Sequence, residues 1–301
     1  MLLLYGSVAV TLARRLLTME EGDRLDPIGQ LAAEFKTGRG TVQAALKLLI
    51  DEGALEVDAL GKRGSFIKKL NREKLLQLGD LTSIIGVMPV ALSTIHYGLS
   101  TGLHYAFEQT DIPLVLAQLR GAKNRLHFLR TGRCDFAIIS RMSWLQEADK
   151  GDLLLLFGFG PGSNVANHAL LMPRKHDNGI VDGMRVGVDP TSHDHFLMAL
   201  KECEGKSVQF IEISYGESIP QLLSGNIDVS ICSESIANLP SELKIVPLQY
   251  QEVHSDTNTE AVLVVRNDSK WIEDLIQNRI DPTFIATIQN NVVNGKEKPV
   301  F

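Results

Sequence analysis

Apolar positions between residues 28 and 51 predict two short helices joined by a sharp turn. Both segments have helical spacing, with Leu31, Ala32 and Phe35 in the first and Val42, Ala45, Leu46, Leu49 and Ile50 in the second. The polar break at residues 36–38 is too short for anything except a tight corner. Two helices joined in this way form either a DNA-binding helix-turn-helix or an ordinary helical hairpin, and these residues alone do not separate the two.

The pattern around these helices extends them to a winged helix. A preceding helix is predicted by an apolar stripe at Val8, Leu12, Leu16 and Leu17. Asp26-Pro27 predicts the next helix start, with a carboxylate as N-cap and proline at the first helical position, and Gly53 predicts a C-cap. A strand at 55–57, a basic turn at 61–64 and a strand at 65–68 then complete the order helix, helix, helix, hairpin.

The stretch from Gly22 to Ile67 resembles the winged-helix domain of GntR-type transcriptional regulators. The residues that match the pattern of that family are Leu31-Ala32, Arg39, Thr41-Val42, Ala45-Leu46, Glu52-Gly53, Gly61 and Gly64. Gly38 and Gln43 depart from it, because a serine cap and a second arginine are usual at these two places. The resemblance implies DNA binding by polar side chains of the second helix, its turn and the wing: Thr37, Arg39, Thr41, Gln43, Lys47, Lys62 and Arg63.

Beyond residue 70 the sequence predicts a linker and then a two-lobed α/β domain. Residues 71–81 are polar with scattered leucines and are predicted to be the linker. A repeat supports two similar halves, because Leu129, Gly132, Asp135 and Ile138 recur at the same spacing as Leu222, Gly225, Asp228 and Ile231. We therefore predict two lobes with parallel sheets, lobe 1 at about residues 82–168 and 255–301 and lobe 2 at about 169–254.

Short apolar runs and helical periodicity place the elements of the two lobes. Strands are predicted at 84–88, 114–119, 153–157, 169–172, 185–188, 208–213 and 259–265, and helices at 95–108, 193–202 and 270–289. The strands at 153–157 and 169–172 are expected to carry the chain across to lobe 2. The strand at 259–265 is expected to return it to lobe 1.

This arrangement resembles the type 2 periplasmic-binding-protein fold, which LysR-type regulators use for effector binding. Ligands in such folds bind where the carboxyl ends of strands and the N-termini of helices face a cleft. The segments expected there contribute the candidate ligand-binding residues Ser93, Thr94, Arg120, Ser140, Arg141, Thr191, Ser192, His193 and Glu234. Free backbone N–H groups at the helix start after Ser192 favour a carboxylate or phosphate, so the expected effector is small and anionic.

Each of these candidates also has a structural interpretation. The turn at Ser192 and the matching one at Ser93-Thr94 could cap helices without touching a ligand. Arg120 and Arg141 each follow a strand end, where either could hold an anion or simply be a solvated surface residue. The combination of a GntR-like winged helix with a sensor of this type is itself unusual.

Other candidate chemistry in the chain is weaker. His193 and His195 do not form a metal pair on a helix, because positions i and i+2 face different sides and no third ligand is evident. The glycines at 158, 160 and 162 fit neither a dinucleotide fingerprint nor a P-loop. No nucleophile elbow or catalytic triad is recognisable. We therefore expect no metal, no cofactor and no enzymatic activity.

Composition adds the remaining bounds. The chain has 301 residues, of which 44% are hydrophobic and 22% charged, as in ordinary soluble proteins. Its three widely spaced cysteines fit a reduced compartment, and its apolar start lacks the basic region of a signal peptide. A net charge of −6 argues against a general nucleic-acid coat, but Lys and Arg cluster locally at 36–47 and 62–69.

These observations lead to a hypothesis with two rivals. The expected protein is a cytoplasmic transcriptional regulator, an α/β protein with an N-terminal winged helix-turn-helix and a two-lobed effector domain, without a membrane association. Its expected partners are a double-stranded DNA operator, a small-molecule effector and a second copy of the chain. One rival is a solute-binding or enzymatic α/β protein whose N-terminal helices only dimerise. The other is a regulator whose C-terminal domain is a dimerisation or protein-interaction scaffold without a ligand.

Overall fold

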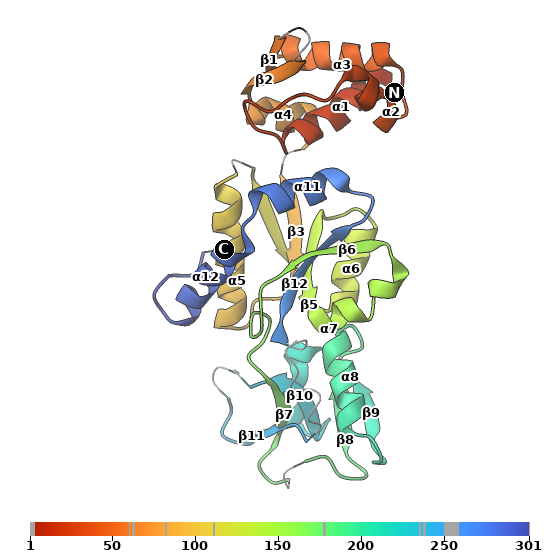
Figure 1. The fold of residues 1–301 in the computed structure, drawn as a ribbon. Helices are drawn as coiled ribbons and strands as arrows, with labels where there is room; N and C mark the ends of the chain where they lie inside the picture. The colour runs from red at the N-terminus through yellow and green to blue at the C-terminus, as the bar shows by residue number, and fades with distance from the viewer. Residues whose placement is uncertain are drawn as a thin grey trace. The chain divides into compact units, whose positions relative to one another are not determined.

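The chain divides into two compact units in the computed structural model (Figure 1). The structure describes residues 4–59, 61, 64–81, 83–110, 112–176, 179–234, 236, 239–249 and 259–300. Unit 1 contains Met1–Ile84, Phe107–Val115 and Ser269–Ile280, and unit 2 contains Ile85–Ala106, Leu116–Asp268 and Asp281–Phe301. No helix among the described residues is long and apolar enough to cross a membrane.

The N-terminal part of unit 1 is a winged helix, as predicted. Its elements are α1 (Leu4–Leu16), α2 (Ile28–Glu34), α3 (Arg39–Asp51), β1 (Leu55–Ala59) and β2 (Ser65–Leu70), with the two strands paired antiparallel. The apolar stripe of α3 is its buried face, because Val42, Ala45 and Leu49 are fully buried against α1 and α2. Residues 22–25 extend the hairpin, since the N–H of Leu25 donates to the carbonyl of Ser65 at 2.9 Å.

The caps of this unit agree with the sequence at one end and differ at the other. Gly53 has a φ of +68° and its N–H donates to the carbonyl of Ile50, which confirms it as the glycine that ends α3. Pro27, and not Asp26, is the N-cap of α2. The Asp26 carboxylate instead pairs with Arg15 of α1, a partner that local sequence does not reveal.

The segment expected to be a linker contains a helix that packs in unit 1. Helix α4 (Arg72–Leu78) is capped by the Asn71 side chain, which accepts from the N–H of Lys74 at 3.1 Å. Its leucines at 75 and 76 are buried, and α4 contacts α1. The scattered leucines of the polar segment are therefore the apolar face of a short amphipathic helix.

Two five-stranded sheets form the two lobes of the α/β domain, which confirms the predicted fold class. The lobe 1 sheet has the order β4 (Leu114–Gln118), β3 (Ile84–Met88), β5 (Phe136–Ser140), β12 (Ala261–Arg266), β6 (Leu153–Gly158). The lobe 2 sheet has the order β11 (Leu243–Pro247), β7 (His168–Pro173), β10 (Val229–Ser233), β8 (Arg185–Val188), β9 (Gln209–Glu212). The expected parallel sheets are mixed, because β7 and β11 in lobe 2 and β12 and β6 in lobe 1 pair antiparallel. The chain crosses between β6 and β7, as predicted, and returns as β12.

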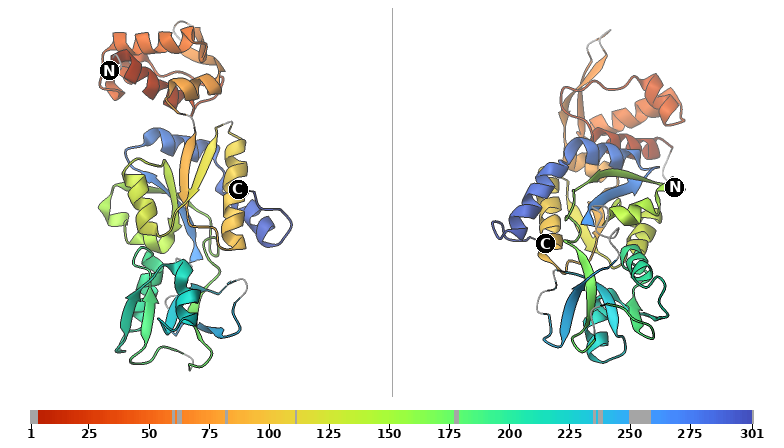
Figure 2. Two further views of the ribbon diagram at one scale, coloured as in Figure 1. Left: turned by 180° about the vertical axis from the view of Figure 1, so that it is seen from behind. Right: turned by 60° about the horizontal axis from the view of Figure 1, so that its bottom comes forward.

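Helices cover the sheets and leave the carboxyl ends of the central strands open. In lobe 1, α5 (Thr94–Glu108) and α12 (Pro282–Val293) lie side by side, and α6 (Ala122–Arg130) and α7 (Arg141–Leu145) lie on the other side of the sheet (Figures 1 and 2). In lobe 2, α8 (His193–Glu202) follows β8, and α9 (Ser218–Leu223) precedes β10. Strands β3 and β5 run parallel, as do β8 and β10, so their carboxyl ends share one edge in each lobe.

The sequence repeat has a structural cause. Gly132 and Gly225 both adopt left-handed backbone conformations, with φ of +68° and +72°. The carboxylate of Asp135 accepts from the N–H of Ile85 at 2.8 Å, and that of Asp228 accepts from the N–H of Arg185 at 2.8 Å. In each lobe the aspartate therefore ties the strand that follows it to a neighbouring parallel strand, β5 to β3 in lobe 1 and β10 to β8 in lobe 2.

Two elements differ from the prediction. The helix expected at 270–289 is two helices, α11 (Lys270–Arg279) and α12, because Pro282 lacks an N–H and the Asp281 carboxylate caps a new start by accepting from the N–H of Thr283 at 2.8 Å. The edge strand β11 was not predicted, since its run of five residues is short and follows loop sequence.

Candidate functional site

The exposed face of α3 carries the polar residues expected to contact DNA. Arg39, Gln43 and Lys47 are exposed and Thr41 is partly exposed, on the side opposite the buried stripe. Lys47 is not a free cation, because its ammonium lies 2.7 Å from the Asp51 carboxylate one turn later. The guanidinium of Arg39 lies against Gly29, where a Cβ would be 3.2 Å from Nη2.

The other three predicted DNA contacts are Thr37, Lys62 and Arg63. The hydroxyl of Thr37 is buried and has no hydrogen-bond partner among the residues that the structure describes, so it is not presented to solvent in this conformation. The N-cap of α3 is Gly38, as the departure from the GntR pattern indicated, and no side chain caps the helix. Lys62 and Arg63 of the wing lie outside the described residues.

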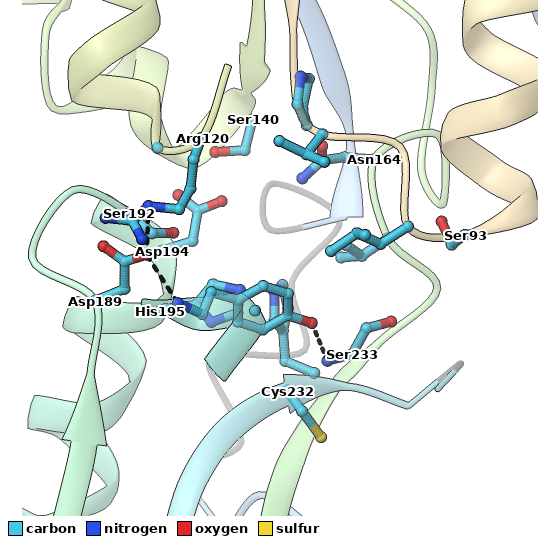
Figure 3. A pocket seen from close by; sticks show the side chains of 18 of the residues that line it. Ser93, Arg120, Ser140, Asn164, Asp189, Ser192, Asp194, His195, Cys232 and Ser233 are labelled. Atoms are coloured by element: carbon cyan, nitrogen blue, oxygen red, sulfur yellow. Dashed lines mark hydrogen bonds and ion pairs between the residues drawn. The ribbon is translucent and has the colours of Figure 1, made fainter. Parts of the chain in front are cut away.

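A cavity of about 530 Å³ lies between the lobes of unit 2, at the strand ends where the sequence predicted a ligand (Figure 3). Four of the nine predicted residues line it, namely Ser93, Arg120, Ser140 and Ser192. Thr94, Arg141, Thr191, His193 and Glu234 are not among the lining residues. The polar residues that sequence reasoning did not select but that line the cavity include His96, Arg125, Asn164, Asp189, Asp194, His195 and Tyr215.

Asp189 occupies the turn where an anionic ligand was expected. Its carboxylate is buried and accepts from the N–H of Thr191 at 3.0 Å, the Thr191 hydroxyl at 2.6 Å and the N–H of Tyr215 at 3.1 Å. Burial acts to raise the pKa of Asp189, but these hydrogen bonds and the charge of Arg120 outweigh it, so the pKa is lowered. The Asp189 carboxylate is therefore ionised at neutral pH.

The two arginines among the lining residues come from lobe 1, and they lie near the carboxylates of Asp189 and Asp194 in lobe 2. Arg120 Nε lies 3.6 Å from Asp189 Oδ2. Arg125 is buried and donates to the backbone carbonyls of Ile138 and Leu119, both at 2.8 Å. Burial lowers the pKa of Arg125 to about 10, against the opposing charge of Asp194, which leaves the guanidinium protonated.

An aromatic cluster forms the lobe 2 wall. The rings of His195 and Tyr215 meet edge to face at 4.2 Å between centroids, and His168 and His195 do so at 5.3 Å. The Tyr215 hydroxyl accepts from the N–H of Ser233 at 3.1 Å. Burial lowers the pKa of His195 and raises that of Tyr215 to about 12, so both side chains are neutral at pH 7.

His96 is the corresponding polar ring on lobe 1. Its Nδ1 lies 3.4 Å from the Ser93 hydroxyl, and its buried Nε2 has no partner in hydrogen-bonding geometry among the described residues. Burial and the charge of Arg125 lower the pKa of His96 to about 4, although the Asn164 side chain acts to raise it. The neutral imidazole can offer a ligand one further hydrogen bond.

Three of the five predicted residues outside the lining have identifiable partners. The Arg141 guanidinium forms a two-pronged pair with Glu260, which supplies its counter-charge. The Glu234 carboxylate accepts from the Asn167 side chain at 3.0 Å. The N–H and the hydroxyl of Thr191 both donate to the Asp189 carboxylate. On α8, Asp194 and His195 line the cavity and His193 does not. Helical spacing could have suggested His195, because it lies two positions from His193 and so faces another side.

Comparisons with known proteins place the whole chain. A family model described as the YhfZ C-terminal domain matches residues 71–301, and a model described as a helix-turn-helix domain matches residues 20–67. The uncharacterized protein YhfZ of Escherichia coli (strain K12) is 31% identical over 300 residues, which cover 98% of this chain and 97% of that protein.

Two solved structures extend the comparison. The crystal structure of YhfZ from Shigella flexneri is 27% identical with a TM-score of 0.62, and the match covers 76% of this chain and 97% of that one. The crystal structure of the B. pertussis BvgS periplasmic domain is 11% identical with a TM-score of 0.51, over 77% of this chain and 46% of that one. The second similarity concerns the fold alone.

Proposed function

The chain belongs to the YhfZ family, and we propose that it is a transcriptional regulator that binds an operator through α3 and the wing and a small effector between its lobes. The observation that carries the proposal is one chain that joins a winged helix to a two-lobed domain with a cavity of about 530 Å³. A cavity of this size suits a small molecule. Its position at the ends of the parallel strands is where α/β folds bind ligands.

The proposed regulator acts in the cytoplasm as a homodimer with a GntR-like mode of DNA contact. In a dimer, two copies of α3 would enter half-sites about one helical turn apart, near 34 Å. A ligand that changes how the lobes meet would alter the dimer, with a coupling free energy of about 1–3 kcal/mol between the two sites. The sequence favoured an anionic effector. The charge of ligand that the cavity accepts depends on the buried Asp189 carboxylate at the turn before α8.

DNA binding is tested first, on the full chain. In vitro selection from random duplexes would identify a bound sequence, and fluorescence anisotropy across a salt series would measure its affinity. Arg39→Ala combined with Lys62→Ala should weaken binding at least about tenfold and reduce the salt slope by about 2, because two phosphate contacts are lost. Lys298→Ala removes an exposed cation from the C-terminal region and should leave binding unchanged. A chain that selects no duplex would contradict the proposal.

Effector binding is tested by the response of that affinity to small molecules. A fraction of cellular metabolites should shift the anisotropy curve of the wild-type protein and raise its melting temperature. A ligand at 100 times its Kd adds about 2.7 kcal/mol of stability. Val165→Trp, which fills the cavity from its lining, should abolish both responses and keep ligand-free DNA binding. Responses that survive in Val165→Trp would place the effector elsewhere.

A further inference from the structure

The turn between β8 and α8 already holds a carboxylate that belongs to the protein. Backbone N–H groups at such a turn attract anions, which is why the sequence predicted an anionic ligand there. The structure puts the buried Asp189 side chain just before the helix start at Ser192, where its carboxylate accepts from the N–H groups of Thr191 and Tyr215. These donors are not available to a second anion.

The cationic groups around the cavity are matched in the same way. Arg120 lies 3.6 Å from Asp189, and Arg125 interacts with the charge of Asp194 while its Nε and Nη1 donate to carbonyls. Arg125 and Asp194 are both buried. Asp194 also accepts from the Ser143 hydroxyl at 2.9 Å. Among the residues that the structure describes, the charged side chains of the cavity lining are these two arginines and two aspartates, whose formal charges sum to zero.

The other lining residues that the structure describes are mostly uncharged polar or apolar ones. His96, His195 and Tyr215 are uncharged at pH 7 for the reasons given above. Serines and Asn164 add hydrogen-bonding groups without charge. The walls between them come from both lobes and include Val90, Leu92, Val165, Leu171, Ile219 and Ile236.

We propose that Asp189 is a built-in counter-ion that excludes anions and restricts the cavity to ligands without net negative charge, in particular uncharged molecules with an apolar body. The inference rests on the proposed effector site and specifies its ligand class. An anion beside Arg120 would stand within a few ångströms of the buried Asp189 carboxylate, and the two like charges would repel each other. An uncharged ligand meets no such repulsion and can still use the serines, Asn164 and His96.

The test uses acetate and sulfate as probes on the full chain, with melting temperatures compared with those in chloride at equal ionic strength. Wild type should show no saturable stabilisation by either anion. Asp189→Asn should gain one, with anion affinity at least about tenfold higher, because Arg120 then lacks its counter-charge. The double variant Arg120→Gln, Asp189→Asn should lose that gain.

A matched control and a second measurement keep the test decisive. Asp268→Asn also removes one carboxylate from an arginine pair, since Asp268 lies 3.0 Å from Arg266, but neither residue lines the cavity. It should gain no anion-dependent stabilisation. Saturable stabilisation of wild type by acetate or sulfate that Arg120→Gln removes would overturn the proposal, whether or not Asp189→Asn folds. This assay contains no DNA, so its result is independent of the DNA-binding test. A chain that binds no duplex but shows no stabilisation by anions would contradict the proposed function and leave this inference standing.

Discussion

The two lobes contribute opposite charges to the cavity that they enclose. Lobe 1 supplies Arg120 and Arg125, whereas lobe 2 supplies Asp189 and Asp194. Both lobes also supply a neutral histidine, His96 in the first and His195 in the second. Lobes built on the same strand and helix pattern thus differ in the charge at their facing edges. Their attraction is present without a ligand, so the ligand does not have to provide the charge that joins them.

Contacts on one side of the cavity show how closely the lobes meet. The N–H of Lys123 in lobe 1 donates to the carbonyl of Thr191 in lobe 2 at 3.3 Å. The Ser143 hydroxyl donates to Asp194 across the same boundary. These two hydrogen bonds lie on the same side of the cavity as the ion pair of Arg120 and Asp189, so close packing and charge both hold the lobes together there.

The largest expected effect comes from adding a side chain at this boundary. Gly121 has a φ of +76°, and a Cβ there would lie 2.3 Å from Thr191 Oγ1 and 2.7 Å from the Thr191 carbonyl oxygen. We expect Gly121→Ala to lower the free energy of unfolding by about 3 kcal/mol, from backbone strain and from steric overlap between the lobes. Urea denaturation measures it.

A second glycine separates the two causes. Gly151 has a φ of +67° and no atom within 4 Å of a Cβ position, so Gly151→Ala carries backbone strain alone and should cost about 1 kcal/mol. If Gly121→Ala and Gly151→Ala lose the same free energy of unfolding, the lobes do not meet at Gly121 in solution. The predicted steric overlap between Gly121 and Thr191 would then be wrong.

The next effect concerns the buried histidine of lobe 1 and depends on pH. The pKa of His96 is lowered from 6.5 to about 4, so the unfolded chain binds a proton at a pH where the folded chain does not. Its neutral form therefore favours folding above pH 6.5, and that contribution is lost as the pH falls from 6.5 towards 4. We expect about 2 kcal/mol less stability at pH 4.5 than at pH 7 from this residue. Urea denaturation at both values measures it.

Substitution assigns this pH dependence to a lobe. His96→Gln should remove its share of the loss, and His195→Gln should remove a separate share, because burial lowers both pKa values. An unchanged pH profile in His96→Gln would mean that Arg125 and burial do not hold this imidazole neutral.

Local patterns were enough to predict most of the elements that build the two lobes. The strands at 84–88 and 185–188 and the helix at 193–202 agree with the structure residue for residue, because alternation, helical spacing and caps are all local in sequence. The break at Pro282 was equally local, but the apolar pattern continues across it and concealed the end of α11.

The cavity was predictable in position but not in charge. Arg120 and Arg141 both follow a strand end, yet Arg141 is paired with Glu260, which lies 119 positions away in sequence. An anionic ligand was expected at the N–H groups of the helix start after Ser192, but the sequence did not show that the nearby Asp189 carboxylate accepts from the N–H groups of Thr191 and Tyr215. Which partner satisfies a polar group depends on tertiary packing, and a single sequence does not show it.

The smallest expected effect concerns two serines, Ser93 immediately before α5 in lobe 1 and Ser192 immediately before α8 in lobe 2. Ser93 accepts from the N–H of His96 at 3.4 Å, whereas Ser192 makes no side-chain cap to α8. Ser93→Ala should therefore lower the free energy of unfolding by about 0.5–1 kcal/mol, and Ser192→Ala by less than about 0.5 kcal/mol, as measured by urea denaturation. Equal losses would show that Ser192 also caps its helix in solution. If only Ser93→Ala loses stability, the Ser192 hydroxyl does not cap α8 and is available to a ligand in the cavity. The turn before Ser192 is then held by the Asp189 carboxylate.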